Sequence, residues 1–194
     1  MQGVRSIRRR IITTLIVVLS IVVLVLTDQL FKMLFVKIDN EQNIVLNPIK
    51  VIDNFFYLTL VYNTGSAYSF LSDVAWAQTF FKILTPIALC AFGFMTYLSV
   101  KNRYKVATIG LILVISGTLG NFIDRLISGQ VVDFLTIIIG GKRIFGVFNI
   151  ADVFLTVGII MVIVHLLFLD KNCLFGRKNG GKDNKDNGDQ GKLE

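Results

Sequence analysis

Residues that build metal and nucleophile sites are scarce in this sequence, which has two cysteines and one histidine. Cys90 lies inside an apolar run and Cys173 lies near the C-terminus, and neither has CxxC or Cys/His spacing. This pattern indicates neither a zinc site nor a disulfide framework. His165 has no serine, cysteine or carboxylate at catalytic spacing, and the serines lack a lysine or histidine partner. We therefore expect no metal, no cofactor and no serine mechanism.

Charge is also scarce. Charged residues make up 17% of the 194 residues and hydrophobic residues 54%, with a mean hydropathy of +0.68. Such a chain is too apolar for an ordinary soluble domain and too short for a large transporter, so we expect one integral membrane domain. The net charge of +7 comes from basic residues beside hydrophobic runs, without an aromatic-interleaved patch. Membrane topology explains them, and no nucleic-acid partner is expected.

Four long apolar runs predict four transmembrane helices. The first follows four arginines and resembles a signal peptide, but no A-x-A-like cleavage site follows it. Asp28 and Lys32, spaced i,i+4, continue helix-compatible sequence beyond it, so we interpret the run as a retained helix. The expected helices cover about residues 11–31, 74–100, 106–123 and 149–169.

Two connecting segments differ from the helices in composition. In the segment of about 36–73, β-branched and aromatic residues gather in 51–62 before a turn at 63–65, which predicts a small β-sheet outside the hydrocarbon. The loop 126–148 is mixed, with a hairpin-like turn at Gly140-Gly141. Residues 1–170 are thus expected to form one membrane domain. The polar stretch 171–194 is expected to be a disordered cytoplasmic tail.

Basic residues predict the orientation in the membrane. The N-terminus carries four Lys or Arg, the 101–105 connection three and the tail six, all on one side if there are four spans. By the positive-inside rule that side is cytoplasmic. Both termini are therefore expected to be cytoplasmic and the small sheet extracytoplasmic.

Polar residues interrupt the otherwise apolar stretch from Gly117 to Asp152, where charge is costly and marks a functional-site hypothesis. They are Asn121, Asp124, Arg125, Asp133, Asn149 and Asp152. The predicted topology brings all six, with Asn63, to the outer membrane boundary.

Asp133 and Asp152 could approach each other there. Two carboxyl groups in one site can share a proton, so that one activates water and the other acts as the acid. Asn149 can cap the last helix, which places Asp152 in its positive first turn and favours its ionised form. Asn121 and Arg125 share a helix face and could orient the carboxylates. Asp124 points away from Arg125 and is expected to pair elsewhere.

Two alternatives use the same residues without peptide hydrolysis. A small transporter or proton-relay protein would need ionisable groups staged across the bilayer, and the inner halves of the last two helices offer only His165. A non-catalytic assembly subunit is the other alternative.

Several boxes together resemble the bacterial lipoprotein signal peptidase family, signal peptidase II. They are Asn63–Ser69, Gly117–Arg125, Val132–Phe134 and Phe148–Asp152, with Asp28 and Lys32 in the first helix. The resemblance extends from Ile11 to Leu169. Departures are mild: Ser66, Tyr68 and Thr118 stand where other residues are commoner in the family.

The resemblance implies a multi-pass aspartyl endopeptidase of the bacterial cytoplasmic (inner) membrane, with its active site at the extracytoplasmic face. Its substrates would be diacylglyceryl-modified prolipoproteins, cut just before the lipidated cysteine. Its other binding partners would be membrane lipids. It is expected to act as a monomer. By the same resemblance Asp133 and Asp152 are catalytic. The matching substrate-binding or supporting residues are Asn63, Gly65, Asn121, Arg125 and Asn149, and the structural polar residues are Asp28, Lys32 and Asp124.

Overall fold

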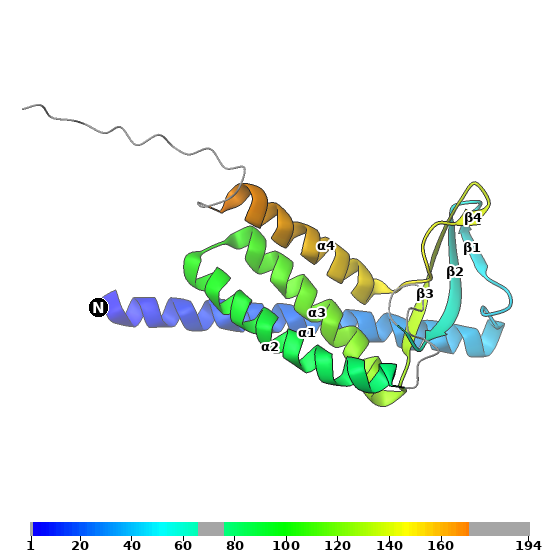
Figure 1. Cartoon of the computed structure of the whole chain (residues 1–194), viewed down its shortest axis with the longest axis horizontal. Coiled ribbons are helices and arrows are strands. Elements are labelled where there is room, and N and C mark those ends of the chain that lie inside the picture. Colours follow the sequence, from blue (N-terminus) through cyan, green and yellow to red (C-terminus); the bar gives the residue numbers. More distant parts are fainter. Residues whose placement is uncertain (1, 66–75, 171–194) are drawn as a thin grey trace, which may run out of the picture.

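The computed structural model describes residues 2–65 and 76–170, so the expected tail 171–194 lies outside the described residues. The described chain is mostly helical and carries a small antiparallel sheet (Figure 1). Its elements in chain order are α1 (Gln2–Gln42), β1 (Ile49–Ile52), β2 (Phe56–Asn63), α2 (Ala77–Asn102), α3 (Lys105–Ile127), β3 (Val131–Ile139), β4 (Lys142–Arg143), α4 (Ile150–Val164) and the π-helical turn η2 (His165–Leu169).

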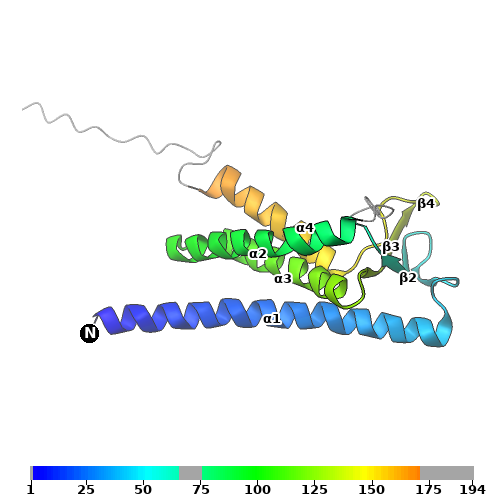
Figure 2. The same cartoon turned by 60° about the horizontal axis from the view of Figure 1, so that its bottom comes forward.

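The four expected spans are confirmed as candidates by length and composition. Four helices are long and apolar enough to cross a membrane: Ile7–Gln42, Gln78–Asn102, Lys105–Ile127 and Ile150–Leu169. They form a bundle in which the start of α1, the α2–α3 connection and the end of α4 lie at one end (Figure 1). The sheet lies at the opposite end, where α1 extends past the other helices (Figure 2).

Helices α3 and α4 form the closest helix pair because small residues let their backbones approach. A Cβ atom added to Gly158 would lie 2.6 Å from the Gly110 carbonyl oxygen, and one added to Gly117 would collide with the Ala151 carbonyl. Close packing through small residues is typical of membrane helices. The contact fixes the end of α3, with Asn121, against the start of α4, with Asp152.

The sheet has the order β1-β2-β3-β4, with every neighbouring pair antiparallel. In the central β2–β3 pair, Val61 lies opposite Asp133 and Leu58 lies opposite Leu135. Between these pairs two residues of β2, Thr59 and Leu60, lie opposite one residue of β3, Phe134, which is a β-bulge beside Asp133. Bulges of this kind change the direction of neighbouring side chains at functional sites.

The first helix is longer than expected, which corrects the start of the predicted β-rich segment 36–73. Helix α1 continues to Gln42, and the first strand begins only at Ile49. The extension is stabilised from outside the helix: the Phe35 ring stacks on Phe134 of β3 with centroids 4.2 Å apart, in a core completed by Ile44 and Leu60. The helix ends before Asn43, whose positive φ of 51° stops it.

The loop expected at 126–148 contains the longest strand. Residues Val131–Ile139 form β3, which places Asp133 within the sheet rather than on a connecting loop. The turn at Gly140-Gly141 is confirmed, with φ of 60° and 73°. After this turn the strand β4 covers only Lys142–Arg143, and within 144–148 an isolated bridge joins Phe148 to Leu135.

Candidate active site

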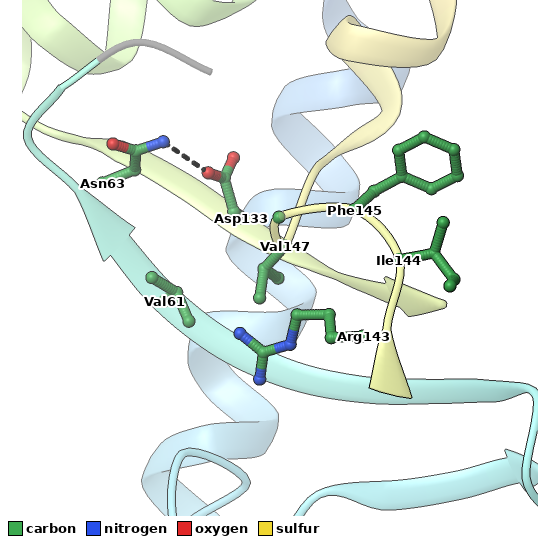
Figure 3. A pocket seen from close by; sticks show the side chains of 8 residues that line it. Val61, Asn63, Asp133, Arg143, Ile144, Phe145 and Val147 are labelled. Atoms are coloured by element: carbon green, nitrogen blue, oxygen red, sulfur yellow. Dashed lines mark hydrogen bonds between the residues drawn. The ribbon is translucent and has the colours of Figure 1, made fainter. Parts of the chain in front are cut away.

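Asp133 lies near the start of β3 and points into a site between the sheet and the helix ends. Its side chain is 2% exposed. One carboxylate oxygen accepts a hydrogen bond from the Asn149 amide at 2.7 Å. The other accepts one from the Asn63 amide at 3.0 Å, as Figure 3 shows. Strand β2 positions Asn63 for this bond, since it pairs with β3 at Val131.

Asp152 lies in the first turn of α4, and the predicted N-cap is confirmed. The Asn149 side chain accepts a hydrogen bond from the Asp152 backbone N–H at 3.0 Å, and the Asp152 carboxylate accepts one from the Asn149 backbone N–H at 3.1 Å. This reciprocal capping box fixes both side chains. The other Asp152 oxygen accepts a hydrogen bond from the Asn121 amide at 2.8 Å.

Asn149 therefore joins the two carboxylates. Its side-chain amide donates to Asp133 while its backbone N–H donates to Asp152. The same amide also donates to the Asn121 side-chain oxygen at 3.0 Å, and Asn149 is fully buried. We call Asp133, Asp152, Asn149, Asn121 and Asn63 the amide-bound cluster, because its carboxylates accept hydrogen bonds from asparagine amides.

The environment favours a protonated Asp133. Burial and the nearby Asp152 charge raise the pKa of Asp133 to about 7, against the lowering effects of the Asn63 and Asn149 hydrogen bonds. A carboxyl group with such a pKa can hold or release a proton near neutral pH. This property is required of a group that exchanges protons with a substrate.

A second polar cluster lies behind the first, on the side of α1. Lys32 lies between two carboxylates, 2.8 Å from Asp28 and 2.8 Å from Asp124. Gln29 donates to Asp124 at 3.0 Å and to Asp28 at 3.2 Å. We call these four residues the ion-pair cluster. The expectation that Asp124 pairs away from Arg125 agrees with this ion pair.

The ion-pair cluster holds the backbone next to both candidate catalytic residues. Asp28 accepts a hydrogen bond at 2.9 Å from the backbone N–H of Ala151, which precedes Asp152. Asp124 accepts one at 3.2 Å from the N–H of Val132, which precedes Asp133. Lys32 also donates to the Asn121 side-chain oxygen at 3.0 Å. The segments that carry the two aspartates are thus fixed from behind.

Arg125 and Gly65 are brought to the edge of the site rather than into contact with the carboxylates. The Arg125 guanidinium donates to the Gly65 carbonyl at 3.0 Å and lies 4.9 Å from the centroid of the Phe81 ring. The Gly65 N–H donates to the Asn63 side-chain oxygen at 2.9 Å. Both residues therefore support the segment that carries Asn63.

Two cavities meet at Asp133. The larger, of about 550 Å³, contains both aspartates and is lined on one side by α4 residues such as Val153 and Val157. The smaller, of about 340 Å³, lies over the sheet and is lined by Val61, Asn63, Asp133 and residues 143–147 (Figure 3). Asn63, Asp133 and residues 145–147 line both. A substrate could therefore extend in two directions from the aspartates.

Sequence reasoning missed three contributors. Gln29 was identifiable, because it is a polar residue beside Asp28 in an apolar helix. Gly120 is required for space: a Cβ atom there would lie 2.5 Å from a carboxylate oxygen of Asp28. Nothing in the sequence distinguishes residues 145–147, which line the cavities largely through their position after β4.

Comparison with known proteins agrees with this geometry. A family model described as Signal peptidase (SPase) II matches residues 20–168. Lipoprotein signal peptidases of Maridesulfovibrio salexigens and Clostridioides difficile are 37% and 36% identical, over 76% and 79% of this chain and 91% and 95% of theirs. A solved bacterial membrane enzyme superposes with a TM-score of 0.64 at 35% identity, over 78% of this chain and 87% of that one. The chain belongs to the signal peptidase II family, aspartic peptidases of bacterial membranes that remove signal peptides from prolipoproteins.

Proposed function

We propose that Asp133 and Asp152 are the catalytic pair, and that they hydrolyse the peptide bond just before a diacylglyceryl-modified cysteine. The observation that carries this assignment is the bridge through Asn149, which donates to both carboxylates at 2.7 Å and 3.1 Å. Both carboxylates also line one cavity. Asn63, Asn121 and Asn149 orient the pair, and Arg125 and Gly65 hold the segment beside it.

The two aspartates have different roles in this proposal. Asp152, at the positive end of α4, is the ionised base that takes a proton from water as the water oxygen attacks the scissile carbonyl. Asp133 gives its proton to the carbonyl oxygen. When the tetrahedral intermediate breaks down, the proton held by Asp152 passes to the leaving nitrogen, and the hydroxyl proton returns to Asp133. The pair is then ready for another cycle.

The larger cavity suits an apolar substrate. Its α4 wall belongs to a candidate membrane span and carries Val153, Leu155 and Val157. Burying lipid chains or the apolar part of a signal peptide there is favourable, at about 25 cal/mol per Å² of apolar surface. We assign the diacylglyceryl group and the signal peptide to this cavity.

The site faces the extracytoplasmic side of the bacterial cytoplasmic (inner) membrane in this proposal. Arg8, Arg9 and Arg10 and the basic connection 101–105 belong to the bundle end opposite the sheet (Figure 1). The positive-inside rule makes that end cytoplasmic. Residues 1–170 then form one peptidase domain with both termini inside. Because one chain supplies both aspartates, a monomer is sufficient for the reaction.

The test uses Asp133→Asn and Asp152→Asn in the purified full-length protein. Each change preserves shape but removes a carboxylate, so we expect processing of a diacylglyceryl-modified prolipoprotein to fall about 10³-fold or more. Shortening of the prolipoprotein on a gel measures it. Asp53→Asn is the matched control, because Asp53 is 69% exposed and pairs only with Lys50 among the described residues, apart from a hydrogen bond from Tyr57. Full processing by either active-site variant would exclude this catalytic pair.

A further inference from the structure

The smaller cavity contains a charge that the proposed reaction does not use. Arg143 ends the two-residue strand β4 and lines the cavity that also contains Asp133. Figure 3 shows its side chain extending from β4 toward Val61 of β2, whereas Ile144 and Phe145 point away. Among residues 2–65 and 76–170, no carboxylate forms an ion pair with Arg143 and no group accepts a hydrogen bond from it. The guanidinium is available to a ligand.

The backbone beside Arg143 is also available. Strand β4 ends at Arg143, the Ile144 N–H makes one more hydrogen bond to the Ile137 carbonyl of β3, and pairing returns at Phe148, which exchanges hydrogen bonds with Leu135. Between them, the N–H and C=O groups of Phe145, Gly146 and Val147 make no hydrogen bond to any described part of the chain. Because these three residues line both cavities, an extended peptide passing Asp133 can pair with them, as peptides pair with free strand edges elsewhere.

The two cavities differ in what they can bury. Both are lined by an arginine, but Arg125 in the larger cavity donates to the Gly65 carbonyl, whereas Arg143 in the smaller has no partner among the described residues, and the larger also has an apolar wall from α4. Covering an unpaired guanidinium with apolar chain is costly, so the smaller cavity suits a polar occupant. Of the parts of the substrate on either side of the bond cut at Asp133, the start of the mature protein after the cysteine is the polar one. The signal peptide and the lipid are apolar.

We propose that the smaller cavity binds the first residues of the mature lipoprotein, and that Arg143 favours substrates with a carboxylate side chain there. The proposal rests on the proposed function, since it places the scissile bond at Asp133. Guanidinium groups bind carboxylates with paired, directional hydrogen bonds. An extended chain advances about 3.3 Å per residue. Arg143 lies opposite Ile138, five residues from Asp133 along β3, and its side chain extends back toward Val61 (Figure 3), so the preferred position lies within about the first four residues after the cysteine.

The experiment compares substrates that differ at one position. A diacylglyceryl-modified prolipoprotein carries Asp, Asn or Lys in turn at each of the first four positions after the cysteine, and kcat/KM is measured with the full-length protein. We expect Asp to exceed Asn by about threefold to fivefold at one position, as for a partly exposed ion pair, with Lys lowest. High salt should reduce the difference.

Two variants assign the preference to Arg143. In Arg143→Gln the Asp and Asn substrates should be processed at equal rates, and in Arg143→Glu the order should reverse in favour of Lys. The matched control is Lys142→Gln, which removes the same charge from the same strand outside the cavity lining and should keep the preference for Asp.

Three results would overturn the proposal: a wild-type protein indifferent to the substrate charge, a Lys142→Gln variant that behaves like Arg143→Gln, or an Arg143→Gln variant that slows all substrates equally. The last result would indicate a structural role or a bound lipid phosphate. Failure of the proposed function looks different, because then the wild type would cleave none of the substrates or Asp133→Asn would cleave them normally.

Discussion

The molecule contains two pairs of aspartates that differ in their neighbours; Asp28, Asp124 and Asp133 are buried and Asp152 is half-buried. Asp28 and Asp124, in the ion-pair cluster, share the ammonium group of Lys32 at 2.8 Å each. Asp133 and Asp152, in the amide-bound cluster, have no lysine or arginine within 4 Å among the described residues and accept hydrogen bonds from asparagine amides instead. Neither cavity described above is lined by the first pair, whereas both aspartates of the second line the larger one.

The difference shows how burial can give aspartates opposite properties. A cation at contact distance favours the charged form of a carboxylate, which becomes a fixed ion that can hold backbone N–H groups. Without such a cation, burial favours the protonated form, and the pKa of Asp133 rises to about 7. The first pair fixes the positions of Ala151 and Val132, and the second can exchange protons beside them. In our interpretation one pair holds the other in place.

Removing Lys32 should have the largest effect on stability and processing, because it takes the cation away from the first pair. Lys32→Met leaves Asp28 and Asp124 buried, at 0% and 7% exposure, without their cation. Breaking a buried ion pair from one side costs about 3–5 kcal/mol, so the free energy of unfolding should fall by that amount and processing should be lost with it. Thermal unfolding in detergent measures the first effect and the gel assay the second.

The matched control neutralises the whole cluster. In Asp28→Asn/Lys32→Met/Asp124→Asn no buried charge is left unpaired, so most of the lost stability should return. Activity should recover less than stability, because the bond from Lys32 to Asn121 is still missing. A triple variant no more stable than Lys32→Met would show that the first pair is not held together by charge.

The second largest effect is the pH dependence of kcat/KM and of stability, which should come from Asp133 in the second pair. If Asp133 is the acid, it must carry its proton, and above its pKa of about 7 kcat/KM should fall toward tenfold per pH unit. The folded protein holds this proton more tightly than the unfolded chain, whose pKa is near 3.8, so stability should also fall as pH rises through that interval. Rate and unfolding measurements from pH 5 to 9 test both. A rate that rises from pH 7 to 9 would contradict this role for Asp133.

Much of the fold was predictable from the sequence, for identifiable reasons. Long apolar runs gave the four helices because a membrane span needs about 20 apolar residues. Gly140-Gly141 gave the hairpin turn because both residues adopt positive φ. The end of α1 was not predictable: the helix continues past residue 36 because Phe35 stacks on Phe134, about 100 residues away in the chain, and no local pattern reports such a contact.

The residues of the site were more predictable from the sequence than the contacts between them. Asn149 as the N-cap before Asp152 is a local pattern and was found. That Lys32 lies between Asp28 and Asp124 depends on the packing of α1 against α3, and Asp28 further needs Gly120 for space. Asp133 was expected on a loop, and its place on β3 depends on pairing with β2, a non-local contact.

The smallest expected effect comes from removing one hydrogen-bond donor from each pair of aspartates. Asn63 donates a hydrogen bond to Asp133 and thereby lowers its pKa, so Asn63→Ala should raise that pKa further and move the alkaline fall in kcat/KM upward by about one pH unit. Gln29→Ala removes a comparable bond to Asp124 and is the matched control in the other pair. It should lower the free energy of unfolding by about 1 kcal/mol and leave the pH profile in place, because Asp124 keeps Lys32 as its counter-ion. If Gln29→Ala moved the profile as far as Asn63→Ala, the division between a fixed pair and a proton-exchanging pair would be wrong.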